Sequence, residues 1–239
     1  MRAADPAIRV LPFVLSVIAG ATDSIGFLGL NGLFTAHITG NIVILAARII
    51  AGNPAIISYI LSVPVFMVVL FLTRLLASGL ERAEISTLRP LLLLQLIFLG
   101  AFLVLCVTAG PWRDADAILA VLAGMCGVAA MAVQNALVQI SLTHSPTTAV
   151  MTINVTHFML DLGEALAGAD PAAAAAARGR AMRTLPVIAG FAVGCGLGAA
   201  SEAAAGLWSL ALPTDPALFA LARTSVTSAT RPSDPQASA

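Results

Sequence analysis

The sequence predicts an all-α protein: a polytopic transmembrane helix bundle of six to seven helices with two internal three-segment repeats. Of its 239 residues, 59% are hydrophobic and only 10% are charged, and the mean hydropathy is +0.97. A typical soluble domain is about one quarter charged, so this chain has too little polar surface to clothe a water-soluble globule. The formal net charge is zero, which gives no indication of nucleic-acid binding. The composition therefore predicts the lipid bilayer as the partner of this chain.

Seven apolar segments follow one another along the chain. They cover residues 10–30, 36–52, 55–77, 90–109, 116–142, 147–168 and 184–212. Most of them reach the ~20 residues that span a bilayer as a helix. Helices satisfy every backbone polar group internally, as a hydrocarbon environment requires. The segments lack the alternating polar period of a transmembrane barrel. Seven spanning helices are therefore the simplest expectation.

Short polar stretches separate these segments. They read GNP at 52–54, SGLERAEISTLRP at 78–90, GPWRDAD at 110–116 and THSP at 143–146. The alanine-rich stretch 170–183 has polar ends and is interpreted as a connection, either irregular or folded as a short surface helix. From Pro213 onward Pro, Ser, Thr and Ala dominate, a composition typical of disordered segments. We therefore expect one transmembrane domain over 1–212 and a disordered C-terminal tail over 213–239.

The distribution of arginine leaves a second topology open. If all seven segments span and the N-terminus is inside, Arg82 and Arg89 fall outside, against the positive-inside rule. If 36–52 and 147–168 are half-length or re-entrant, seven arginines lie inside. These are Arg2, Arg9, Arg82, Arg89, Arg178, Arg180 and Arg183. Seven spans give two parallel repeats around a linker helix, whereas half-length segments give inverted repeats; both plans occur in transporters.

Two polar stretches inside apolar segments are alike. TAHITGN at 35–41 and TAVMTIN at 148–154 are identical at four of seven positions, at an offset of 113 residues. The identical residues are Thr35, Ala36, Thr39 and Asn41 in the first copy and Thr148, Ala149, Thr152 and Asn154 in the second. The match predicts a duplication: repeat one over about 10–78, a linker helix over about 90–109 and repeat two over about 116–212. Corresponding polar interruptions point to a binding site near the bilayer midplane, where Thr39 and Asn41 are expected to bond near Thr152 and Asn154.

Charged and amide side chains accompany both motifs. Asp23, upstream of the first motif, stands opposite Gln134 and Asn135, one residue out of register. Arg48 stands opposite Asp161, seven residues past each asparagine, which predicts an ion pair of Arg48 with Asp161 or Asp23. A charge at mid-bilayer costs ~2.5–3.5 kcal/mol, so Asp23 is expected to face the bundle interior. The simpler alternatives are that Asp23 caps its helix and that Arg48 snorkels to the interface.

The second motif continues into a polar stripe. Asn154, His157, Asp161 and Glu164 are spaced by three, four and three residues, which places them on one face of a helix. The stripe fits a proton relay and also fits hydrogen bonding between helices. A separate glycine stripe at 190, 194 and 198 predicts close helix packing.

These patterns favour a small-solute transporter or permease, with the proton as a possible coupling ion. Its path would be lined by Asp23, Thr35, His37, Thr39, Asn41, Arg48, Gln134, Asn135, Thr148, Thr152, Asn154, His157 and Asp161. The alternative is a membrane protein for assembly, sensing or subunit partnership, in which polar residues only pack helices. No catalytic, phosphate-binding or dinucleotide motif is found, so we expect no enzyme activity, no cofactor and no metal.

Two blocks of the sequence resemble a known family. AGATDSIGFLGLNGLFTAHITGNIVIL, and later AAMAVQNALVQ followed by TTAVMTINVT, are similar to the conserved blocks of the YoaK family of bacterial membrane proteins. The resemblance covers about residues 10–212 and implies a multi-pass protein of the bacterial inner membrane with six or seven helices, without implying a substrate. Ile153 stands where that family usually has glycine, so only the first motif, with Gly40, offers a flexible backbone.

Overall fold

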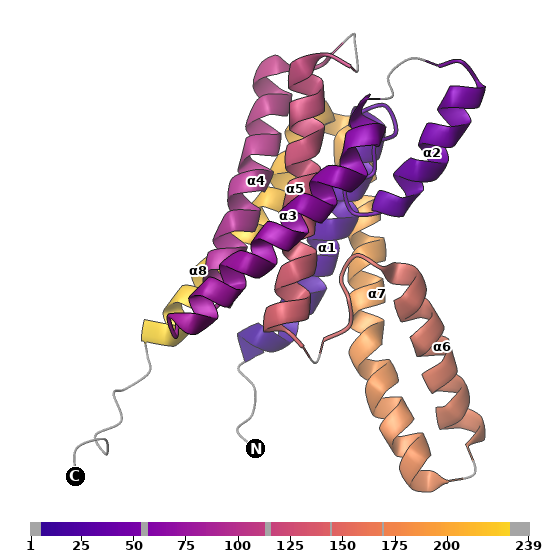
Figure 1. The fold of residues 1–239 in the computed structure, drawn as a ribbon. Coiled ribbons are helices and arrows are strands. Elements are labelled where there is room, and N and C mark those ends of the chain that lie inside the picture. Colours follow the sequence, from indigo (N-terminus) through magenta and orange to yellow (C-terminus); the bar gives the residue numbers. More distant parts are fainter. Residues whose placement is uncertain (1–5, 54–56, 113–115, 144, 169, 230–239) are drawn as a thin grey trace, which may run out of the picture.

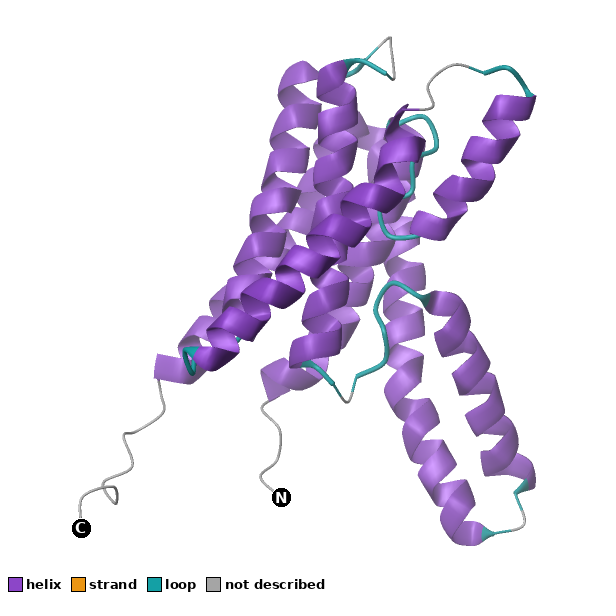
Figure 2. Ribbon diagram, in the orientation of Figure 1, coloured by secondary structure: helices purple, strands orange, loops and turns teal. Residues whose placement is uncertain are grey.

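The computed structural model describes residues 6–53, 57–112, 116–143, 145–168 and 170–229, and every regular element in these ranges is helical. The elements are α1 (Pro6–Gly29), α2 (Ile38–Ile50), α3 (Ile57–Arg82), α4 (Leu88–Ala109), α5 (Ile118–Ser141), α6 (Met151–Ala167), α7 (Pro171–Ala205), the 3-10 turn η1 (Gly206–Leu210) and α8 (Ala211–Ala229). Figures 1 and 2 show them packed as a helical bundle. The prediction of an all-α transmembrane bundle is confirmed.

Five helical stretches among the described residues are long and apolar enough to cross a bilayer. They are Val10–Gly29, Ile57–Arg82, Leu88–Ala109, Ile118–Ser141 and Pro171–Leu221. The last stretch contains α7, η1 and the first half of α8, and Figure 1 shows α7 and α8 running in opposite directions. Figure 1 also shows that α1 begins and α8 ends at the same end of the bundle.

The two segments that carry the repeated motif do not form long helices. α2 has 13 residues and α6 has 17, because irregular chain occupies 30–37 ahead of α2, and 142–143 and 145–150 ahead of α6. In Figure 1 both begin beside the middle of the longer helices, and they extend in opposite directions. The expectation of seven full spans is therefore wrong, and the alternative with two half-length segments is the one that the structure adopts.

The chain near the C-terminus is more helical than its composition predicts. α7 starts at Pro171 and absorbs the expected connection 170–183, because alanine is the strongest helix former and the Asp170 carboxylate accepts bonds from the first backbone N–H groups. α8 runs to Ala229 and buries Ala217 and Ala220. The predicted tail is therefore wrong over 213–229, and residues 230–239 lie outside the described ranges.

Glycine lets α1 and α7 approach each other closely. A Cβ atom added to Gly194 would lie 2.3 Å from the carbonyl oxygen of Val17, and one added to Gly198 would lie 2.8 Å from Ala21 backbone atoms. On α1, a Cβ on Gly20 would lie 2.3 Å from the Phe191 carbonyl oxygen. These backbone contacts confirm that the glycine stripe of α7 serves helix packing.

The other helices surround this pair in a regular pattern of contacts. α5 packs against α3 and α4, and α8 packs against α1 and α4, while α2 lies on α3 and α6 on α7. The end of the bundle where α1 begins is here called the arginine-rich end. It carries Arg82 and Arg89 at the α3–α4 connection and Arg178, Arg180 and Arg183 at the start of α7.

Candidate functional site

Asp23 of α1 holds the loop that precedes α2. One carboxylate oxygen accepts the backbone N–H groups of Thr35 and Ala36, both at 2.8 Å. The other carboxylate oxygen lies 2.6 Å from Nδ1 of His37. Asp23 is only 3% exposed, so these bonds replace the water that a buried carboxylate needs. The expectation that Asp23 faces the bundle interior is confirmed, and its partner is His37 rather than an arginine.

The asparagine of each motif closes its own loop. Asn41 accepts a bond from the N–H of Phe34 and donates to its carbonyl oxygen, at 2.9 and 2.8 Å. Asn154 donates to the carbonyl oxygen of Thr147 at 2.6 Å, again seven residues earlier. The expectation that the two motifs bond near each other is therefore wrong, because their amides are used locally. Thr39 and Thr152 of the motifs are exposed.

Gln134 of α5 holds the second loop, much as Asp23 holds the first. Its amide nitrogen donates to Oγ1 of Thr148 and to the carbonyl oxygen of Leu15, both at 2.9 Å. Its amide oxygen accepts a 2.7 Å bond from Gln95 of α4. Three helices and the loop thus meet at one buried side chain. Asn135, in contrast, bonds only the Met131 carbonyl of its own helix.

Arg48 and Asp161, predicted to pair, have other partners. The guanidinium of Arg48 donates to the Asn31 carbonyl and lies 5.0 Å from the centre of the Tyr59 ring. Asp161 pairs with Arg180 at 2.7 Å, and Arg180 also bonds Glu164 at 3.0 Å. The predicted Arg48–Asp161 pair is wrong, since Arg180 at the start of α7 lies directly against the polar stripe of α6.

A first cavity of about 450 Å³ opens between α1, α2 and α7. Asp23 and His37 lie at one wall, and apolar side chains form most of the rest. Three phenylalanines line it: Phe27 of α1, Phe34 of the loop and Phe191 of α7. The ring centres of His37 and Phe191 are 5.5 Å apart, in an edge-to-face arrangement with an angle of 64° between the ring planes. In this space, the aromatic cavity, the buried carboxylate of Asp23 and the partly exposed imidazole of His37 lie beside apolar walls.

A second, more polar cavity of about 570 Å³ lies between the end of α5, α6 and α7. Its lining includes Asn154, His157 and Asp161 of the polar stripe together with Arg180 and Arg183. We call it the polar cavity. His157 and Asp161 of the stripe therefore line the polar cavity, whereas Asn154 is buried and Glu164 pairs with Arg180 of α7.

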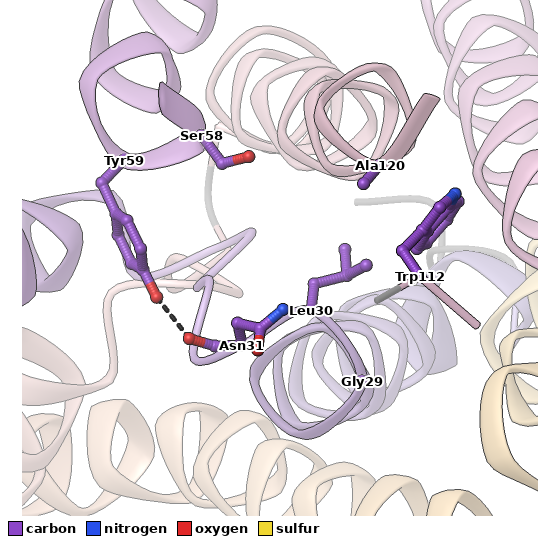
Figure 3. A pocket seen from close by; sticks show the side chains of 7 residues that line it. All are labelled: Gly29, Leu30, Asn31, Ser58, Tyr59, Trp112 and Ala120. Carbon is purple, nitrogen blue, oxygen red and sulfur yellow. Dashed lines mark hydrogen bonds between the residues drawn. The ribbon is translucent and has the colours of Figure 1, made fainter. Parts of the chain in front are cut away.

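A third space, of about 20 Å³, lies beside the start of the loop that precedes α2. Asn31, Tyr59 and Trp112 are among its lining residues (Figure 3). The Tyr59 hydroxyl donates to the Asn31 carbonyl, which the Arg48 guanidinium also bonds. Asn31 holds a left-handed φ of 56°, a conformation that asparagine tolerates better than most residues. The space has room for about one water molecule, so it is a structural pocket rather than a solute site.

The candidate residues of the sequence thus separate into groups. Those at the aromatic cavity are Asp23 and His37, and those at the polar cavity are Asn154, His157 and Asp161. Thr35, Asn41, Gln134 and Thr148 anchor the loops, while Thr39, Arg48, Asn135 and Thr152 take no part in either cavity wall. Within the described residues no cluster of three His, Cys, Asp or Glu side chains suits a metal ion.

Pattern reasoning missed three contributors. Gln95 was visible as a polar residue in an apolar run, yet it belongs to the linker helix, outside both repeats. Arg180 was assigned to a connection. Phe191 gave no signal, because an aromatic residue that lines a cavity has the same hydrophobic character as one that faces lipid.

One family model matches the chain. It is described as protein of unknown function (DUF1275), and it covers residues 11–222. No curated protein and no solved structure matches the chain. The matched range contains both motifs and all the residues that line the two larger cavities.

Proposed function

The chain belongs to the family described as protein of unknown function (DUF1275), and we propose that it is a secondary transporter for a small solute. One observation carries the proposal. Two short helices, α2 and α6, begin beside the middle of the longer helices and run in opposite directions, and each follows a loop that the asparagine of a repeated motif holds (Figure 1). Half-length helices of this kind line the solute sites of several secondary transporters.

The packing supports an inverted repeat of α1–α3 and α5–α7 around the linker α4. α1 packs on α7, and α5 packs on α3; α2 lies on α3, and α6 lies on α7. If α1, α2 and α3 are exchanged with α5, α6 and α7, the contact of α1 with α7 becomes that of α5 with α3. In the same way, the contact of α2 with α3 becomes that of α6 with α7. Phe34 and Thr147, the carbonyl partners of the two motif asparagines, share the offset of 113 residues that relates the motifs.

The orientation follows from the arginines. With α2 and α6 as re-entrant segments and with α7 and α8 each crossing once, the long helices make six crossings. The arginine-rich end then faces the cytoplasm by the positive-inside rule. We assign the chain to the bacterial inner membrane, in keeping with its resemblance to the YoaK family.

Both larger cavities use the same helix. Thr184 of α7 lines the polar cavity near the arginine-rich end, and Phe191, further along α7, lines the aromatic cavity. Seven residues separate them, which is about 10 Å of helix. A shift of α7 along the glycine contacts with α1 would change both cavities together. Alternating access in inverted-repeat transporters is such a movement of one unit against the other.

A second candidate function is a non-transport membrane protein whose polar groups only hold loops. The observation that favours it is the local use of Asn41 and Asn154, which bond within their own loops and leave no amide pointing between the repeats. This second function assigns no role to the two cavities. It also predicts that both cavities keep a fixed accessibility.

Thiol labelling separates the two functions. Cys195 lines the aromatic cavity, so it serves as a native probe once Cys106 and Cys126 are replaced by alanine. Thr143→Cys places a probe at the polar cavity, and Ser86→Cys, at an exposed position in the connection between α3 and α4, is the control. Labelling rates with a membrane-impermeant methanethiosulfonate are measured in vesicles of either orientation, with and without an imposed proton gradient.

A transporter changes the labelling rates of the two cavity probes in opposite directions when the gradient is imposed, while the Ser86→Cys rate stays unchanged. Proteoliposomes loaded with a pH-sensitive dye then test whether addition of solutes drives proton flux. Labelling rates that ignore the gradient at both cavities, together with no flux for any solute class, would overturn the transport proposal in favour of the packing function.

A further inference from the structure

The aromatic cavity has the volume and lining of a small-molecule site. Its ~450 Å³ falls in the range of about 300–1,000 Å³ typical of such sites. The walls are mostly apolar, with a single acidic side chain, Asp23, at one side. An apolar chamber with few polar groups selects ligands with a hydrophobic body and one charged or hydrogen-bonding centre.

The charge of this cavity is set by Asp23 and His37 together. One carboxylate oxygen of Asp23 accepts two backbone N–H bonds, and the other lies 2.6 Å from Nδ1 of His37. The imidazole of His37 is 38% exposed, so its second ring nitrogen can exchange a proton. With His37 neutral the pair carries one negative charge, and with His37 protonated it carries none.

The aromatic rings suit a positively charged ligand. Phe27 and Phe34 lie with their ring centres 4.8 Å apart, and Phe191 faces His37 from α7. The face of an aromatic ring attracts cations, most strongly where water is excluded. Clusters of aromatic rings bind quaternary ammonium groups in other proteins. The apolar walls disfavour small, strongly hydrated ions.

We propose that the aromatic cavity binds a monovalent organic cation in competition with a proton on His37. The inference rests on the proposed transport function and gives it a substrate class: the solute is a hydrophobic ammonium compound exchanged for a proton. The single negative charge of the Asp23–His37 pair is neutralised either by the proton or by the ligand. Double occupancy would leave a net positive charge in an apolar chamber, which is costly.

The charge of the aromatic cavity depends chiefly on Asp23 and His37, because the other charged side chains nearby are directed elsewhere. Among the described residues, the titratable side chains that line the cavity with His37 are Asp23 on α1 and Cys195 on α7. On α2, Arg48 is directed to Asn31 and Tyr59. Further along α7, Glu202 lies beside Gly29 and is absent from the cavity wall.

Binding of benzyltrimethylammonium to the full-length protein in nanodiscs tests the proposal by titration calorimetry. A neutral molecule of similar size, 3-phenylpropan-1-ol, is the ligand control. Between about pH 8 and about pH 5 the affinity for the cation should fall, approaching tenfold per pH unit below the pKa of the histidine. Titrations in buffers of different ionisation enthalpy should show close to one proton released per cation bound at the acidic end.

Three variants identify the groups involved. Asp23→Asn removes the charge and keeps an oxygen for the loop N–H groups, so at about pH 8, where the pair of the unmodified protein is negatively charged, affinity should fall at least about tenfold. His37→Gln removes the titrating group, so the remaining affinity should no longer vary with pH. Phe191→Leu keeps an apolar side chain and removes one ring face, for an expected loss of about threefold to tenfold.

Cation binding that is independent of pH in the unmodified protein would overturn the proposal, as would equal affinity for 3-phenylpropan-1-ol. If Asp23→Asn does not fold, the pH dependence of the unmodified protein and the Phe191→Leu variant decide the matter. Cation binding without flux in proteoliposomes would overturn the transport function and support the cation site. Flux of a different solute without cation binding would overturn the cation site and support the transport function.

Discussion

Phe34 and Gly40 fit together at the start of α2, with room for no further atom between them. A Cβ atom added to Gly40 would lie 3.0 Å from the ring of Phe34, closer than side chains tolerate without a shift. In the second motif the corresponding positions hold Thr147 and Ile153. A large loop residue faces a small helix residue in the first copy, and the sizes are exchanged in the second. Gly40 is thus required for space, and its backbone has the ordinary helical conformation.

This size exchange predicts the outcome of swapping residues between the motifs. Gly40→Ile alone forces the Phe34 ring to move and should lower the free energy of unfolding by about 1–3 kcal/mol, as overpacking does. Adding Phe34→Thr recreates the pair found in the second motif and should restore much of the loss. The stability of both variants is measured by thermal unfolding in detergent, with size-exclusion chromatography to monitor the fraction of protein that stays folded.

The matched control is Phe34→Thr by itself, which opens a void and should be less stable than the double variant. If the double variant is no more stable than Gly40→Ile, Phe34 and Gly40 are not coupled. The steric account of the first motif would then be wrong.

Close backbone contact between α1 and α7 predicts a strong position dependence for alanine on α7. Gly194→Ala places a methyl group 2.3 Å from the carbonyl oxygen of Val17, a backbone atom that cannot rotate away. A loss of about 1–3 kcal/mol is expected from this overpacking. Gly196→Ala, two residues along, meets no atom within 4 Å and should gain up to about 1 kcal/mol, because alanine favours helices. Equal stabilities of the two variants would show that the helices are not in this contact.

Composition and the repeated motif were enough to predict a membrane bundle and its polar interruptions. The arginine pattern already favoured half-length segments, since only that topology gathers Arg82, Arg89 and Arg178 on one side. Hydropathy alone already gave 36–52 as a short segment, but it gave 147–168 a spanning length, because that window includes loop residues ahead of α6. An apolar loop residue such as Ala149, which is 2% exposed, has the same hydropathy as a helical one.

The pairing of charges was the least predictable feature. Sequence symmetry placed Arg48 opposite Asp161, but the rotation of each helix is fixed by packing against its neighbours rather than by hydropathy. Asp23 and His37 were both expected at a site, yet their contact depends on how the loop 30–37 folds back onto α1. The aromatic walls of the first cavity could not be predicted, since Phe27, Phe34 and Phe191 read only as hydrophobic residues.

Gln134 should be more important for stability than the residue beside it. Gln134→Leu leaves the buried Thr148 hydroxyl and the Gln95 amide without the partner that they have in the structure, and a buried unsatisfied group costs about 1–3 kcal/mol. Asn135→Leu loses only a bond to the Met131 carbonyl of the same helix, so its loss should be clearly smaller. Chemical unfolding in mixed detergent compares the two. Equal losses would mean that the network does not tie the loop to the bundle.

Arg180 should control how firmly α6 is held against α7. Its guanidinium bonds both Asp161 and Glu164 of α6, and α6 packs chiefly on α7. Arg180 is exposed to solvent, so the effect of its two ion pairs on overall stability is expected to be small, and a distance measurement is the more direct readout.

Spin labels at Gly163→Cys on α6 and Gly196→Cys on α7, in a background without native cysteines, occupy positions with no atom within 4 Å. Arg180→Gln should broaden the measured distance distribution, because α6 loses its only described ion pairs. The exposed Arg178→Gln on the same helix should leave the distribution unchanged. If both variants give the distribution of the parent protein, the contact of α6 with α7 depends on apolar packing, and the polar stripe is free to serve the cavity alone.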